Sequence, residues 1–102
     1  MPSRMKRGCV PRTAQSSRPV FDAALLRELG RCWAELNRSH FDAALAPPAI
    51  QLSDARRRLG SWHRLTRTLT LSRPLMLERS WGMVLEVLRH EMAHQYVDEV
   101  LG

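Results

Sequence analysis

The sequence predicts an α+β fold in which an N-terminal helix, a small three-stranded sheet and a long C-terminal helix follow one another. Three observations lead to this fold class. Apolar residues repeat at helical spacing near both ends of the chain, and short alternating segments lie between them. Pro47-Pro48 separates the first helical pattern from these segments. Because 102 residues form one domain at most, these elements must share a single core.

The first helix is expected from Pro19 or Val20 to about Ser39. Pro19 suits a first helical turn, where its missing N–H is not needed. Charged residues fall mostly off the apolar stripe, as in an amphipathic helix with one buried face. The stripe consists of Phe21, Leu25, Leu29, Cys32, Trp33 and Leu36. We interpret it as part of the core, and Phe41–Pro48 as the loop that follows.

Three short strands are expected in the middle of the chain. Ala49–Ser53 alternates, Leu59–Arg64 is a weaker candidate, and Thr68–Leu71 has the clearest alternation. A single helix from Ser80 to about Leu101 then closes the domain, with Gly102 where a helix terminator is expected. Its apolar stripe consists of Trp81, Val84, Leu85, Leu88, Met92 and Tyr96.

Residues 1–18 are predicted to be a disordered basic tail, which leaves residues 19–102 as the folded domain. The tail is small, polar and charged and shows no periodicity. It is interpreted as a solvated leader, with a non-specific nucleic-acid arm or an organelle transit peptide as alternatives. It has no apolar stretch of the kind that a secretory signal needs, and the chain has no apolar run long enough to span a membrane. We therefore expect a cytoplasmic protein without a membrane partner.

The composition is basic, with a net charge of +6 and a pI of about 10.9. Such a charge favours polyanions but by itself argues only for non-specific attraction. The chain has two cysteines, Cys9 and Cys32, and no C-x-x-C. A disulfide framework and a cysteine-based zinc ribbon within the chain are therefore excluded.

The C-terminal helix contains the motif H-E-x-x-H as His90-Glu91-Met92-Ala93-His94. On a helix the two histidines project from one face, one turn apart, and can bind the same Zn²⁺. Glu91 lies beside them, poorly aimed to bind that ion but able to take a proton from a water on the metal. His90 and His94 are therefore candidate zinc ligands and Glu91 a candidate catalytic base. The alternative is two unrelated surface histidines.

A third ligand is not evident from the sequence. The extended motif that supplies one needs Gly at position 97 and His at position 100, where the chain has Val97 and Val100. Asp98 lies roughly 12 Å along the helix from His90, so one ion cannot bind both these residues and His94. The remaining histidines, His40 and His63, are candidates. The simpler interpretation of each is an ordinary residue, His63 on a strand surface and His40 in a loop.

The chain resembles SprT-like domains over roughly residues 20–102. Phe41–Leu45 with Pro47-Pro48 is similar to the F-x-x-x-L-P element of these domains. The resemblance continues through the strand at residues 50–53, the segment Arg56–Trp62, Thr70-Leu71-Ser72 with Leu75, and the helix Val84–Val97 with its HEMAH motif.

This resemblance implies a zincin-like fold and a zinc-dependent metallopeptidase in which His90 and His94 bind zinc and Glu91 is the general base. It also implies a protein or peptide substrate, which in the Spartan branch is a protein crosslinked to DNA. The third ligand of the family is a histidine downstream of the site helix, so we expect this chain to be an N-terminal part of such a domain, incomplete at its C-terminus.

Two further expectations concern the substrate. An extended peptide is expected to pair with an exposed strand beside the site helix, and Thr68–Leu71 is the strand we place there, with an ordinary internal strand as the alternative. Candidate contacts to nucleic-acid phosphates are Arg56, Arg57, Arg58 and Arg64. The competing function is a catalytically inactive module that binds nucleic acid or a protein. The sequence leaves the oligomeric state open.

Overall fold

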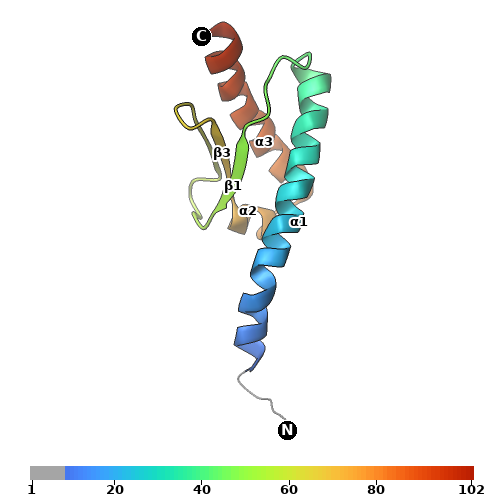
Figure 1. The fold of residues 1–102 in the computed structure, drawn as a ribbon, viewed down its shortest axis with the longest axis vertical. Helices are drawn as coiled ribbons and strands as arrows, with labels where there is room; N and C mark the ends of the chain where they lie inside the picture. The colour runs from blue at the N-terminus through green and yellow to red at the C-terminus, as the bar shows by residue number, and fades with distance from the viewer. Residues whose placement is uncertain (1–8) are drawn as a thin grey trace.

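The computed structural model describes residues 9–102, with side chains from residue 18 onward, and has the predicted α+β architecture (Figure 1). A three-stranded sheet lies beside two long helices and a short one. The elements in chain order are α1 (Cys9–His40), β1 (Ala49–Ser53), β2 (Gly60–His63), β3 (Thr68–Ser72), α2 (Arg73–Glu78), α3 (Trp81–Tyr96) and the π-helix η1 (Val97–Leu101).

The first helix begins at Cys9 rather than at Pro19, so Pro19 lies inside α1. Proline removes one helical hydrogen bond, but its fixed φ is helical, so the helix can continue through it at some cost. In Figure 1 the N-terminal turns of α1 extend beyond the sheet and α3. The division of the chain at residue 18 stays a prediction, and residues 1–8 of the expected tail lie outside the described residues.

The sheet has the order β1-β3-β2, with β1 parallel and β2 antiparallel to β3. The three strands lie where the alternation in the sequence predicts them. The prediction that Thr68–Leu71 is an exposed strand is wrong, because β3 is paired on both edges and Leu69 and Leu71 are 0% exposed. The alternation of β3 therefore reflects an internal strand with one leucine face.

The core lies between one face of the sheet and the two long helices. Helix α1 packs against β1 and α3, and α3 packs against β2 and β3. The strand residues on this face are apolar or small, while Gln51, Ser61 and Thr70 belong to the other face. Fully buried core side chains are Leu29, Leu69, Leu71, Val84, Leu88 and Met92.

The short helix α2 was not predicted. Ser72 caps its N-terminus by accepting a hydrogen bond from the Leu75 backbone N–H at 3.1 Å, and Pro74 occupies its first turn. A serine followed by a proline in this spacing is a sequence signal for a helix start. The helix buries Leu75 and Met76, so it closes one end of the core.

Within residues 9–102, no helix combines the length and the apolar character needed to cross a membrane.

Candidate active site

Helix α3 carries the HExxH motif, and packing against the core fixes the rotation of this helix about its axis. Ser80 caps the helix, with its Oγ accepting from the Met83 backbone N–H at 3.2 Å. Val84, Leu88 and Met92 recur every fourth residue and are 0% exposed. Because this stripe faces the core, the histidines of the motif lie on the exposed side of α3.

His90 and His94 lie one turn apart with exposed side chains. Their ring centroids are 4.9 Å apart and the ring planes meet at 81°. This spacing is compatible with one nitrogen from each ring reaching a common tetrahedral ion. The structure therefore brings together the two ligands that the sequence predicts.

Glu91 is buried, at 7% exposure. Within the described residues its carboxylate has neither a hydrogen-bond donor nor a basic partner. A buried carboxylate without a partner is costly, so the site is suited to a water, a cation or a substrate group that supplies one. Two hollows open onto Glu91: one of about 290 Å³ that also contacts His90, and one of about 270 Å³ that also contacts His94.

Strand β2 forms the wall opposite the motif. Gly60 lies so close to α3 that a Cβ atom there would be 3.0 Å from Glu91 Cγ and 2.9 Å from Val87 Cγ1. Trp62, two residues on, contacts the same hollow as His94. The absence of a side chain at Gly60 thus lets the edge strand approach the helix at Glu91.

Among the side chains that the structure describes, from residue 18 to residue 102, no group of three His, Cys, Asp or Glu is arranged to hold a metal ion, so none supplies a third ligand. His63 borders a hollow with Gln51, Ser61 and Thr70 on the face of the sheet away from α3. His40 ends α1, where its Nδ1 is 2.8 Å from Ser39 Oγ.

Asp98 and Glu99 are also engaged elsewhere. Asp98 Oδ2 accepts a hydrogen bond from Trp62 Nε1 at 2.6 Å. Glu99 pairs with Arg67 at 2.5 Å, and this hydrogen bond holds the pKa of the Glu99 carboxyl below its usual value. Both contacts attach η1, directly after the motif, to the sheet and its loops.

Gln95 is a positioning residue that sequence reasoning missed. It is 0% exposed, its Oε1 accepts from Trp33 Nε1 at 3.3 Å, and its Nε2 donates to the Ala46 carbonyl at 2.9 Å and to Glu99 Oε1 at 3.1 Å. These bonds tie the helix turn that carries His94 to α1 and to the loop before β1. The only sequence signal was an uncharged polar residue directly after the second histidine.

The four predicted phosphate-contacting arginines do not form one patch. Arg56 pairs with Glu78 of α2 at 3.0 Å, whereas Arg58 and Arg64 both border the hollow that contains Glu91 and His94. Arg57 is exposed. Two of the four arginines, Arg58 and Arg64, therefore lie at the motif, whereas Arg56 is engaged by α2.

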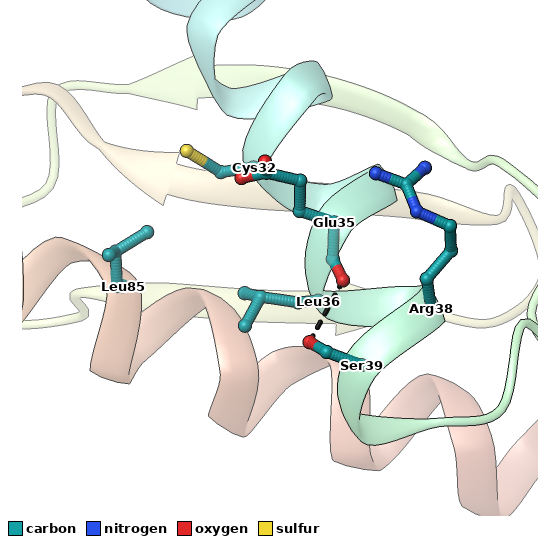
Figure 2. A pocket seen from close by; sticks show the side chains of 6 residues that line it. All are labelled: Cys32, Glu35, Leu36, Arg38, Ser39 and Leu85. Atoms are coloured by element: carbon teal, nitrogen blue, oxygen red, sulfur yellow. Dashed lines mark hydrogen bonds between the residues drawn. The ribbon is translucent and has the colours of Figure 1, made fainter.

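A larger open hollow, of about 510 Å³, lies between α1 and α3 (Figure 2). It is lined by Cys32, Glu35, Leu36, Arg38, Ser39 and Leu85, and in it Ser39 Oγ donates to the Glu35 carbonyl at 2.9 Å. Burial is the main cause of a raised pKa of the Cys32 thiol, which disfavours the reactive thiolate. This hollow contains none of the motif residues, so it is separate from the candidate active site.

Comparison with known proteins assigns the fold and motif to a family. No curated protein and no solved structure matches the chain. The model of the SprT-like family matches residues 29–102, which is more than half of the chain and includes the sheet and the HExxH helix. The chain therefore belongs to the SprT-like family.

Proposed function

We propose that this chain provides the catalytic helix and the substrate-binding strand of a zinc-dependent metallopeptidase. The observation that carries the proposal is Glu91, a buried carboxylate without a partner among the described residues, placed between two exposed histidines and open to hollows on both sides. Family membership supports the same reaction class.

His90 and His94 are the residues that would hold zinc. Two imidazoles on one helix face suit the preference of zinc for nitrogen ligands, so the donors present fit the metal, although a complete site has at least one further protein ligand. When bound, zinc would polarise the scissile carbonyl and lower the pKa of a water to about 7.

Glu91 would act as the general base. Its carboxylate takes a proton from the attacking water and then delivers that proton to the leaving nitrogen of the cleaved amide. Glu91 packs against Gly60 of β2, and the hollows on its two sides give a water and a substrate access to it.

Strand β2 is the proposed docking site for the substrate backbone. One of its edges pairs with β3, and within the described residues no strand pairs with the other. An extended peptide added to this edge would lie beside α3, near Glu91. We assign peptide docking to Gly60–His63 and not to β3, the strand for which the sequence predicts this role, because β3 is internal.

The wider setting of the reaction is also a proposal. The resemblance of the chain to SprT-like proteins supports proteins associated with DNA as substrates, and the net charge of +6 is favourable for approach to a polyanion.

The test is peptide hydrolysis by the zinc-loaded chain, compared with Glu91→Gln. The variant keeps both histidines, so we expect it to retain zinc and to lose about 10²–10⁴-fold in rate. Glu35→Gln removes an exposed carboxylate on α1 and is the matched control, with an unchanged rate. Hydrolysis by Glu91→Gln at the wild-type rate would contradict the proposal. Zinc binding without hydrolysis by any variant would favour the catalytically inactive binding module.

A further inference from the structure

The hollow beside Glu91 and His94 has two basic side chains at its border. Arg58 precedes β2 and Arg64 follows it, and both contact this space of about 270 Å³ together with Trp62. Within the described residues neither guanidinium forms an ion pair with a carboxylate. Three other arginines near the sheet, Arg56, Arg67 and Arg73, each pair with an acid.

Two acidic residues, Glu91 and Asp98, also border this hollow, so their contacts decide whether the two guanidinium groups are already paired. Asp98 already accepts the Trp62 indole N–H at 2.6 Å, which fixes one of its oxygens. Glu91 is the proposed base and is needed for the proton transfer. Neither acid is bonded to Arg58 or Arg64, so both guanidinium groups are available to an incoming anion.

The dimensions of the space favour a side chain over a nucleic-acid backbone. A hollow of about 270 Å³ is large enough for a side chain, whereas phosphate tracking needs a row of cations along a surface. Arg56, which precedes Arg58 by two residues, does not extend this pair into a row, because it pairs with Glu78 on α2.

We propose that Arg58 and Arg64 form a specificity subsite for a carboxylate side chain, Asp or Glu, of the peptide substrate. The proposal rests on the proposed peptidase function and adds the class of substrate to it. A peptide paired with the free edge of β2 has side chains on alternating faces, so one of them enters the space bordered by Trp62. There its carboxylate accepts charge-assisted hydrogen bonds from the guanidinium groups.

The test uses fluorogenic peptides that carry one Glu, or the isosteric Gln, at successive positions in an otherwise uncharged sequence. Hydrolysis is measured with the wild-type chain, the double variant Arg58→Gln/Arg64→Gln and the control Arg27→Gln, which removes an exposed charge on α1. At one position the wild type and the control should prefer Glu over Gln by about tenfold in kcat/KM. The double variant should lose that preference and retain hydrolysis of the Gln peptide.

A second measurement separates this proposal from the peptidase proposal. Binding of labelled Glu and Gln peptides to the zinc-free chain is followed by fluorescence anisotropy. If no peptide is cleaved but the Glu peptide binds better and the double variant loses this difference, the peptidase proposal fails and the subsite stands. Equal behaviour of Glu and Gln peptides at every position overturns the subsite. A double variant that keeps the preference for Glu also overturns the subsite. Binding of a labelled single-stranded oligonucleotide is measured in the same way, and the subsite is likewise overturned if the double variant loses only this binding.

Discussion

Replacement of Gly60 by alanine tests the close approach of β2 to α3, the helix that carries the HExxH motif. A Cβ at this position would lie 2.9 Å from Val87 Cγ1, 3.0 Å from Glu91 Cγ and 3.1 Å from Leu71 Cδ2. All three neighbours belong to packed elements, so the strand, the helix or Glu91 itself must move. Overpacking of this kind costs about 1–3 kcal/mol.

The stability change is measured by thermal unfolding of wild type and Gly60→Ala, followed by far-UV circular dichroism. In a domain of this size each kcal/mol corresponds to a fall in Tm of about 4–8 °C. Peptide hydrolysis should fall as well, even at temperatures where the variant is fully folded, because the displaced group is the proposed base.

The control is the same substitution at Gly30 in α1. A Cβ there meets nothing within 4 Å, and alanine in a helix interior is more stable than glycine by about 0.5–1 kcal/mol. The two variants should therefore change stability in opposite directions. The reasoning is refuted if Gly60→Ala is as stable as wild type, or if both variants gain stability.

Three further predictions concern other parts of the fold. Ser80→Ala removes the cap on the Met83 N–H and should lower the free energy of unfolding by about 1 kcal/mol in thermal melts, whereas an unchanged Tm would show that the cap is dispensable. Glu99 has a lowered pKa through its hydrogen bond from Arg67. Its stabilising effect should be complete above the ordinary Glu pKa of about 4.3 and be lost as the pH falls through the lowered native value. Wild type should thus lose stability in acid more steeply than Glu99→Gln in urea titrations at successive pH values; parallel curves would contradict this. Ala43 has φ 58°, where glycine is less strained, so Ala43→Gly should raise stability by up to about 1 kcal/mol in the same assay, and a loss would disprove strain at this position.

The sequence predicted the elements whose periodicity is set by one buried face. The three strands and the HExxH helix belong to this class. Alternation in a strand, and a repeat of every fourth residue in a helix, indicate directly which side chains face the core. It could not order the strands: the alternation of Thr68–Leu71 is the same whether the strand is internal or at an edge. The proposed substrate-binding edge is therefore that of β2, because β3 is the middle strand.

The candidate site was predicted in part for a similar reason. His90 and His94 needed only helical geometry, which local sequence supplies. The buried state of Glu91 depends on Gly60, and the anchoring of the helix depends on the bonds of Gln95 to Trp33 and Ala46. These contacts join residues far apart in the chain, and no local pattern records them.

Zinc binding by the purified chain tests the central claim most directly, that the exposed face of α3 is a metal centre. Titration with Zn²⁺ should saturate at one equivalent per chain in the wild type and in His63→Ala, whose side chain borders the opposite face of the sheet. His90→Ala and His94→Ala should each abolish that site. Equal zinc binding by wild type and both of these variants, or loss of the site in His63→Ala alone, would contradict the account.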